Sequence, residues 1–305
     1  MRLTSDYRKS VLFVGYCEGE EFKPRGTAFL FAFDDGHYLV TAQHVALQLG
    51  DDPFYIRINC HDETARSIPF DPLSLNLRWY FHEDDNVDLA VMPIHYLLDK
   101  RVLDVKTLHC DMLADDAAIS QWSIGAGDLC YAVGLFRLLV GEKRNLPVVH
   151  RGSIATMPGD EKIPVLDWKA PKSEGIRLVE GYLVELTNLK GLSGAPVFVR
   201  PSVTLSDQTA FDKHTLTTYT NTLLLLGVWI SSWDVRAHDT MTDIDRGDTR
   251  LPLGMGIVVP IAKLIEILQS ESAKSQRQAA AREIDARLKS SADEDEFFRK
   301  GPQLL

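Results

Sequence analysis

Short apolar runs alternate with polar turns along most of the chain, from about residue 10 to residue 262. Runs of about 4–8 residues rich in Val, Ile, Leu, Phe and Tyr, bounded by Gly, Asp, Asn or Pro, are typical of β-strands. No helical pattern of about 10–15 residues separates these runs, so a parallel α/β sheet is not expected. The pattern predicts strands over residues 11–16, 27–33, 38–41, 54–59, 78–81, 88–94, 129–135, 148–155, 182–186, 196–199, 223–231 and 255–259.

The pattern changes at Pro260. Apolar residues recur at i, i+3, i+4 and i+7 from Ile261, which predicts a helix over about residues 260–270 that packs one face on the core. Residues 271–290 are rich in Ala, Glu, Lys, Arg and Gln, and this composition predicts a helical extension. Residues 291–305 are expected to form a frayed acidic tail.

The composition is that of a folded globular protein. The chain has 305 residues, of which 45% are hydrophobic and 25% charged, enough for one large or two modest domains with a buried core. Its formal net charge of −10 disfavours a phosphate-binding surface. We therefore expect neither nucleic acid nor a membrane as a partner.

The first residues carry no secretion signal, because residues 1–10 lack an apolar core. No apolar run approaches the roughly 20 residues of a membrane span. The four cysteines, Cys17, Cys60, Cys110 and Cys130, lack the spacing of metal ligands and are expected to be reduced. The sequence thus predicts a cytoplasmic protein with no metal and no other cofactor.

The segment Gly191-Leu192-Ser193-Gly194-Ala195 is the strongest chemical signal. Glycine inside ordered structure is costly unless its backbone freedom is used. One use is a tight loop that aims backbone N–H groups and a serine hydroxyl at one point, as an acyl-transfer site requires. Taken alone, the segment fits equally well a Ser/Gly turn between two strands.

Two further polar residues stand at the ends of apolar runs. His44 follows the run of residues 38–40 within Thr-Ala-Gln-His, and Asp88 directly precedes Leu-Ala-Val. Each has an ordinary structural interpretation, as a buried histidine at a strand end or as a carboxylate of a solvated loop. Together with Ser193 they complete the chain order His, Asp, Ser, and this order separates triad folds from one another.

The local sequence excludes an α/β-hydrolase site. That fold needs its serine on a strand-to-helix elbow, with the acid and the histidine later in the chain. After Ser193, residues 196–199 predict a short strand rather than a helix. His214 and His238 follow, but both lie in polar segments.

The three segments resemble the chymotrypsin-like (trypsin-fold) serine peptidases, whose serine loop reads Gly-x-Ser-Gly-Gly-Pro and whose histidine lies in Thr-Ala-Ala-His. Within that family the chain is similar to the bacterial Deg/Htr-type branch. Gly-Asp-Leu-Cys-Tyr-Ala-Val-Gly at 127–134 looks like its Gly-Asp-x-Val-x-Ala-Ile-Gly strand. Met-Gly-Ile-Val-Val-Pro at 255–260 looks like the segment that leads into its closing helix. The resemblance covers roughly residues 25–270.

The resemblance implies an all-β fold of two six-stranded antiparallel Greek-key barrels with a C-terminal helix. Barrel one would span about residues 10–120 and barrel two about residues 121–260, within a peptidase domain of residues 1–270. Residues 271–305 would form the helical extension and acidic tail, with no PDZ module after the barrels. Periodicity alone predicts only the all-β class.

The resemblance also implies roles for individual residues. The chain would be a serine endopeptidase that cleaves peptide bonds through an acyl-enzyme, with protein or peptide substrates. Ser193 would be the nucleophile, His44 the general base and acid, and Asp88 the residue that orients the imidazole. The backbone N–H groups of Gly191 and Ser193 would form the oxyanion hole.

Specificity is expected to depend on residues near the serine. Thr187, Ser232 and Gly256 are expected to edge an uncharged pocket, which predicts small or apolar side chains at the P1 position of the substrate. Ile230, Ser231 and Ser232 are similar to the edge strand of the family, which implies that they pair with an extended substrate. Acidic residues in the segment that follows favour basic peptides instead.

Three long inserts, residues 157–181, 200–221 and 232–253, are expected to form loops that wall and gate the cleft. Gating loops suit a protease that must not act without restraint inside a cell. We therefore expect low basal activity that a partner protein raises, with residues 271–290 as its docking helix.

Two residues depart from the family pattern. Leu192 replaces the Asp or Asn before the serine, so activation by an ion pair with a newly cut N-terminus is not available. Ala195 replaces the second glycine, which is costly if its φ must be positive. These departures leave one alternative function open, a catalytically weak pseudoprotease that binds peptides or proteins without cutting them.

Overall fold

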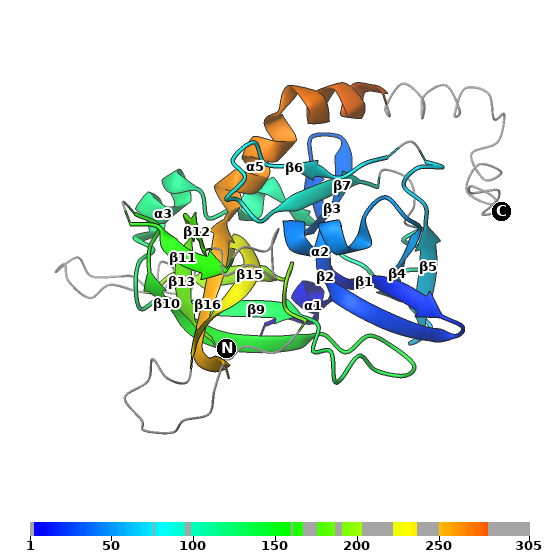
Figure 1. Ribbon diagram of the computed structural model, residues 1–305, viewed down its shortest axis with the longest axis horizontal. Helices are drawn as coiled ribbons and strands as arrows, with labels where there is room; N and C mark the ends of the chain where they lie inside the picture. Colours follow the sequence, from blue (N-terminus) through cyan, green and yellow to red (C-terminus); the bar gives the residue numbers. More distant parts are fainter. Residues whose placement is uncertain are drawn as a thin grey trace.

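Two groups of strands follow one another along the chain and lie side by side in the computed structural model (Figure 1). The structure describes residues 3–75, 77–94, 99–159, 161–166, 176–186, 191–202, 222–236 and 250–279. The first group consists of β1 (Val11–Glu18), β2 (Glu21–Phe33), β3 (Gly36–Thr41), β4 (Phe54–Asn59), β5 (Ala65–Phe70), β6 (Tyr80–Phe81), β7 (Ala90–Pro93) and β8 (Leu108–His109). The second consists of β9 (Leu129–Gly134), β10 (Val148–Thr156), β11 (Ile163–Leu166), β12 (Ile176–Val179), β13 (Tyr182–Glu185), β14 (Pro196–Arg200), β15 (Leu224–Arg236) and β16 (Arg250–Pro260). The named helices are α1 (Ser5–Lys9), α2 (Gln43–Leu49), α3 (Asp116–Trp122) and α5 (Ile261–Gln269).

An eight-stranded sheet forms the first group, in the order β5-β4-β1-β2-β3-β7-β6, with β8 paired to β2. Its pairs are antiparallel except for β2 with β8, which run parallel. The central strands are apolar on both faces, and residues 28–31 of β2 and 38–40 of β3 are buried throughout. The central strands are therefore covered on both faces, unlike a sheet with one solvent-exposed face.

The second group contains a closed barrel in the order β10-β13-β16-β15-β14-β9, with every pair antiparallel. Its interior is a buried apolar cluster to which Ile154, Val184, Val197, Leu226 and Trp229 belong. A barrel of this size is filled by its own side chains. Val133, Phe198 and Val228 of the same strands belong instead to the buried cluster of the first sheet, so parts of these strands are apolar on both faces.

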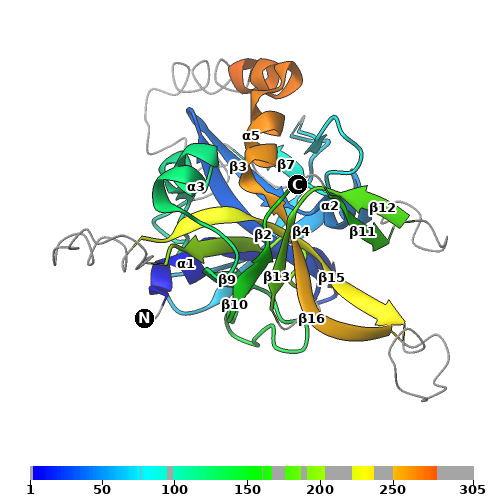
Figure 2. The ribbon, with the colours of Figure 1, turned by 90° about the vertical axis from the view of Figure 1, so that its left-hand side faces the viewer.

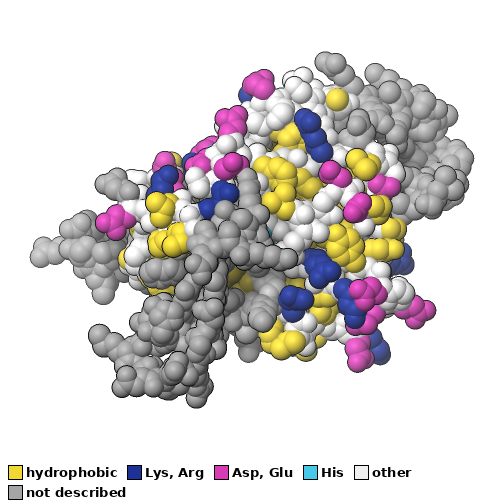
Figure 3. Space-filling model, viewed as in Figure 1, with side chains coloured by type: hydrophobic (Ala, Val, Ile, Leu, Met, Phe, Trp, Pro, Cys, Tyr) yellow, Lys and Arg dark blue, Asp and Glu magenta, His cyan; other side chains and the backbone are white. Residues whose placement is uncertain are grey.

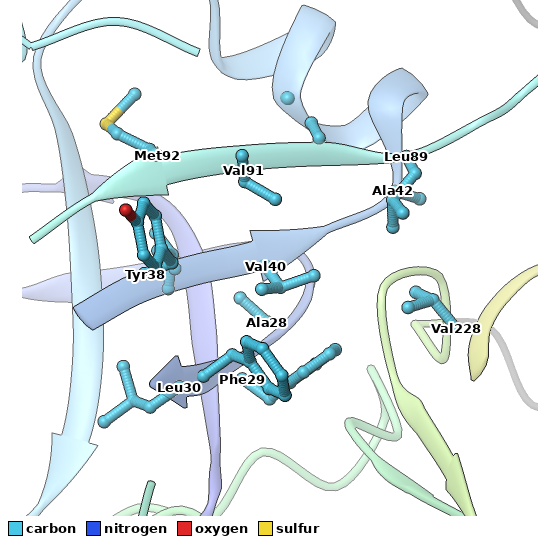
Figure 4. Packing of buried hydrophobic residues seen from close by; sticks show 14 of the residues in the cluster. Ala28, Phe29, Leu30, Tyr38, Val40, Ala42, Leu89, Val91, Met92 and Val228 are labelled. Carbon is cyan, nitrogen blue, oxygen red and sulfur yellow. The ribbon is translucent and has the colours of Figure 1, made fainter. Parts of the chain in front are cut away.

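The apolar core of the first sheet continues onto the outer face of the barrel. Val228 of β15 belongs to the same buried cluster as Ala42 and Leu89, and Figure 4 shows it on their side of the barrel. The helix α5 then runs from the end of β16 toward the first sheet (Figure 2) and buries Ile261 and Leu264 in the same cluster. Burial of each such side chain stabilises the folded state by roughly 1.5–3 kcal/mol. The helix α5 therefore stabilises the contact between the barrel and the first sheet.

The all-β class is confirmed, and the closed barrel, the second sheet and the C-terminal helix agree with the two-barrel architecture that the resemblance implies. The prediction of a loop over residues 157–181 is wrong, because β11 and β12 pair there as a two-stranded sheet. Each has only four residues, and Pro164 interrupts the first, so neither shows a clear strand period. The predicted insert at 232–253 is also shorter, since β15 continues to Arg236 and β16 begins at Arg250.

The predicted helical extension begins as expected. Residues 271–279 are helical and contact the first sheet. Arg277 donates hydrogen bonds to the carbonyl of Leu268 at 2.6 Å and to the hydroxyl of Tyr38 at 3.2 Å. The predictions for residues 280–305 lie outside the described residues.

The described surface is chemically mixed. On the face of the molecule that Figure 3 shows, Lys and Arg side chains of the described residues are interspersed with Asp, Glu and apolar groups. Large apolar side chains stand exposed at Leu138, after β9, and at Ile176 of β12. None of the helices within the described ranges has the length and apolar character needed to span a membrane.

A buried arginine joins the loop after β9 to the first sheet. Arg57 of β4 is buried, and this burial lowers the pKa of its guanidinium. It donates to the side-chain oxygen of Asn145 at 3.0 Å and to the carbonyls of Gly141 and Glu142 at 3.0 and 2.9 Å. Asn145 donates back to the Arg57 carbonyl at 2.7 Å and exchanges two hydrogen bonds with Asn59. The loop is therefore fixed on β4 by neutral acceptors around one buried charge.

Asn145→Ala is expected to lower the free energy of unfolding by roughly 1.5–3 kcal/mol, because it removes an acceptor from a buried guanidinium and a donor from the Arg57 carbonyl. Chemical denaturation followed by circular dichroism measures the change. Gln48→Ala, on the exposed face of α2, is the control and should change stability by less than about 0.5 kcal/mol. Equal stability of Asn145→Ala and the wild type would show that this network does not hold the loop.

Candidate active site

The first sheet brings His44 and Asp88 together. β3 ends at Thr41 and α2 begins at Gln43, so His44 lies in the first turn of that helix. Thr41 pairs with Ala90 of β7, which places Asp88 beside the start of α2. The His44 Nδ1 and Asp88 Oδ2 atoms are 2.7 Å apart, and the His44 backbone N–H donates to Oδ1 at 2.8 Å. The carboxylate therefore fixes both the ring and the backbone of one residue.

This pair is shielded from water at its acidic end. The Asp88 side chain is 2% exposed, and the His44 side chain is 19% exposed. Burial opposes protonation of His44, but the charge of Asp88 and its hydrogen bond outweigh burial, so the pKa of His44 is raised above its usual 6.5. With Nδ1 directed at the carboxylate, Nε2 is the ring nitrogen that can exchange a proton with a ligand.

Ser193 lies on the loop that leads into β14, and this loop packs on the first sheet. The Ser193 carbonyl accepts a hydrogen bond from the N–H of Thr27 at 3.0 Å. Gly194 has a φ of 87°, a conformation that other residues rarely adopt. A side chain there would collide with the Thr27 carbonyl and the Thr41 hydroxyl. The serine is therefore held beside the end of β3, from which His44 follows.

The Ser193 hydroxyl donates to the carbonyl of Ile230 at 3.4 Å, a long hydrogen bond. Within the described residues it has no hydrogen bond to His44. Ile230 lies in a β-bulge, where the register of β15 against β16 shifts between Trp229 and Ser231. The structure thus brings the three predicted triad residues into one region without closing the hydrogen-bond chain from serine to carboxylate.

The serine loop also offers two backbone donors. Gly191 has a φ of 112°, which again favours glycine. In the described part of the chain, the N–H groups of Gly191 and Ser193 donate no backbone hydrogen bond, whereas those of Gly194 and Ala195 do. These are the two donors that the sequence predicts for an oxyanion hole. Two such donors beside a hydroxyl suit the negative charge that develops on a carbonyl oxygen under attack.

Thr27 of β2 ties the serine loop to its surroundings. Besides its N–H bond to Ser193, its hydroxyl donates to the Gly191 carbonyl at 2.8 Å. The same oxygen accepts from the N–H of Leu135, after β9, at 2.8 Å, and the Thr27 carbonyl accepts from the Thr41 hydroxyl at 2.7 Å. Thr27 is fully buried, so water does not compete for these bonds. Sequence reasoning missed this residue, because no local pattern signals a contact across 164 residues.

The predicted substrate-binding residues lie on β15 and β16, except for one. Ser231 and Ser232 are partly exposed, whereas Ile230 and Gly256 are buried. Ser232 pairs with Gly256 across the two strands. Thr187 lies outside the described residues, so its place in the pocket stays a prediction.

One side of this part of β15 is open in the described chain. β14 pairs with β15 only as far as Val228, while β16 continues to pair with it beyond that point. On the β14 side, the backbone of residues 230–232 therefore pairs with no described strand. Such an edge next to Ser193 is suited to bind an extended peptide as an added strand.

The two departures from the family pattern both point into apolar surroundings. Leu192 and Ala195 are 1% and 0% exposed and belong to the buried cluster inside the barrel. Ala195 does not have a positive φ, so its methyl group brings no backbone strain. An acidic side chain at the position of Leu192 would need a buried partner. The serine loop is held by apolar packing and glycine conformations instead.

A closed barrel beside a second β-sheet, with a histidine–carboxylate pair and a serine loop at their contact, defines the chymotrypsin-like fold class. Similar solved structures include the Rv3671c protease of M. tuberculosis in its inactive and active forms. Each is 15% identical to this chain and covers 87% of it, with 89% and 81% of those chains covered and TM-scores of 0.42 and 0.43. No protein-family model and no curated protein matches the sequence. The likeness therefore concerns the fold alone.

The His44 imidazole is expected to titrate above 6.5, and Asp88→Asn is expected to lower that pKa, because it removes the charge that favours the imidazolium. NMR titration of the ring measures both values. A pKa that is higher in the folded than in the unfolded chain stabilises the fold fully below pH 6.5, and this contribution is lost as pH rises through the folded pKa. His150, whose pKa is lowered by burial alone, is the control, and its pKa should be the same in the wild type and in Asp88→Asn. An unchanged His44 pKa in Asp88→Asn would contradict the pairing.

Thr27→Val keeps the shape of the side chain but leaves the Gly191 carbonyl and the Leu135 N–H without a partner. Each buried group left unpaired is expected to lower the free energy of unfolding by roughly 1–3 kcal/mol. Chemical denaturation measures the loss, and Thr27→Ser, which keeps the hydroxyl, should recover most of it. Thr156→Val, at an exposed position of β10, is the matched control. A Thr27→Val protein as stable as the wild type would show that the hydroxyl does not hold the loop.

Proposed function

We propose that this chain is a serine endopeptidase that hydrolyses peptide bonds through an acyl-enzyme. The observation that carries the proposal is the Asp88–His44 pair, with a 2.7 Å contact and a buried carboxylate, beside the glycine-held loop of Ser193. Further support is that Gly194 packs on Thr41, just before the histidine. A nucleophile, a base and an orienting acid are the groups that acyl transfer requires.

In the proposed mechanism, Ser193 Oγ attacks the carbon of the scissile carbonyl, and its proton passes to Nε2 of His44. The carbonyl oxygen becomes an oxyanion, which the N–H groups of Gly191 and Ser193 stabilise by roughly 3–4 kcal/mol per donor. His44 then gives its proton to the leaving amine, the C–N bond breaks and an ester on Ser193 remains. Water, deprotonated by His44, attacks this ester and releases the acid and the serine hydroxyl.

Asp88 acts through the histidine in this mechanism. Its contact with Nδ1 holds the tautomer in which Nε2 is unprotonated and ready to accept the serine proton. Its charge then stabilises the imidazolium that forms, which is the same effect that raises the pKa of His44 in the resting protein. The second contact, to the His44 backbone, keeps the start of α2 from shifting as the ring changes charge.

We extend the proposal to a cytoplasmic peptidase of the Deg/Htr type whose low basal activity a partner raises by binding residues 271–290. The support for this docking site comes from residues 271–279, the part of the segment that the structure describes. Residues 271–279 are helical, and Arg277 bonds to Tyr38 of β3. β3 leads into His44, so a partner that moves this helix would act on the strand that positions the base.

A fluorophosphonate without a peptide part tests the nucleophile alone, because it needs no specificity pocket. We expect the wild type to be labelled at Ser193, Ser193→Ala to remain unlabelled and His44→Ala to react at least about 100-fold more slowly. Mass spectrometry of the intact protein and of its peptides measures rate and site. Ser120→Ala removes an exposed serine of α3 and should be labelled like the wild type.

A wild type that is folded by circular dichroism but unlabelled would contradict the peptidase. The alternative function, a module that binds peptides without cutting them, would then account for the open edge of residues 230–232. Labelling of Ser193→Ala at the wild-type rate would place the nucleophile at another residue.

A further inference from the structure

The indole ring of Trp229 lies against Gly256, one of the residues predicted to edge the pocket for the P1 side chain of a substrate. That pocket is predicted to be edged by Ser232 and Gly256, which pair across β15 and β16. Trp229, earlier on β15, is 1% exposed. A Cβ atom added to Gly256 would collide with the six-membered ring of this tryptophan and would lie 2.7 Å from its Cζ2 atom. The ring therefore lies directly on the backbone of Gly256, where only glycine leaves room for it.

The same tryptophan is bonded to the serine loop. The backbone N–H of Trp229 donates to the carbonyl of Ala195 at 2.9 Å, and the backbone carbonyl of Trp229 accepts from the N–H of Gly194 at 2.8 Å. Its side chain belongs to the buried cluster that also contains Leu192 and Ala195. The indole thus fills the end of the barrel interior between the serine loop and β16.

We infer that Trp229 determines the P1 specificity of the proposed peptidase by filling this pocket, so that only glycine or alanine fits at P1. The inference rests on the proposed function, since it takes Ser193 as the attacking residue. Successive side chains of an extended peptide point to opposite sides. In a substrate that lies along residues 230–232 with its carbonyl at Ser193, the P1 side chain points toward the pair of Ser232 and Gly256.

The sequence predicts small or apolar side chains at P1. With the pocket filled by the indole, only the small ones remain. Valine, leucine and phenylalanine need volume that the indole already occupies, and a closely packed interior does not open such volume without strain. A smaller residue in place of Trp229 would expose Gly256 as the floor of a deeper pocket. The side chain is therefore a barrier that a single substitution removes.

Tripeptidyl phosphonates that differ only in carrying Ala, Val or Phe at P1 test this inference, with the rate of Ser193 labelling measured by mass spectrometry. We expect the wild type to react at least about tenfold faster with the Ala probe than with the Phe probe. Trp229→Ala is expected to reverse this order, and Trp229→Leu to gain reaction with the Val probe. Leu226→Val, inside the same barrel, is the matched control and should keep the wild-type order.

Equal reaction of the wild type with the Ala and Phe probes would overturn the inference and leave the proposed function standing, because Ser193 is then labelled. If Trp229→Ala does not fold, the wild type and Trp229→Leu decide: an unchanged order of rates in Trp229→Leu would overturn the inference. Failure of the fluorophosphonate to label folded wild type would instead contradict the proposed function, and the inference with it.

Discussion

The contact of the serine loop with the first sheet is the constraint on which the site depends, and Thr27 makes it. Its backbone and hydroxyl bind the carbonyls of Ser193 and Gly191, and its own carbonyl binds Thr41, at the end of the strand that leads to His44. One buried residue therefore connects the two sides of the site. A residue with all of its polar groups bonded in a buried position has little freedom to move. The place of the serine relative to the histidine thus follows from strand pairing within the first sheet.

Arg57 and Asp88 are both buried and charged, but they differ in the groups that surround them. Arg57 lies among neutral acceptors of one loop, and none of these three acceptors can take up or release a proton near neutral pH. Asp88 faces His44, a partly exposed group whose charge does change. A buried ion pair is weak evidence of stabilisation, because desolvation offsets much of the attraction. Only the second arrangement can transfer a proton to a bound molecule, which is the role that the proposed function gives to the pair of Asp88 and His44.

The elements that the sequence predicts well are those with long apolar runs. Strands expected over residues 11–16 and 129–135 correspond to β1 and β9, whereas β11 and β12, with four residues each, are too short to show a period. The pairing of His44 with Asp88, and the position of Ser193 in the same region, could be predicted because each residue stands at the end of such a run or between glycines. Thr27 and Trp229 were not, since their importance lies in contacts with distant segments and in the space beside another strand.

The apolar interior of the barrel continues up to the serine, and this continuity changes how the loop can be controlled. Where an acidic residue precedes the serine, an ion pair can order the loop; Leu192 instead packs in the same cluster as Trp229. The position before Ser193 therefore carries no charge that needs a buried partner. In the proposed regulation, a partner would therefore act on the packing around this loop rather than on a charge within it. Arg277 donates a hydrogen bond to Tyr38 of β3, and in the proposed regulation this contact would connect the C-terminal helix to the strand that leads to His44.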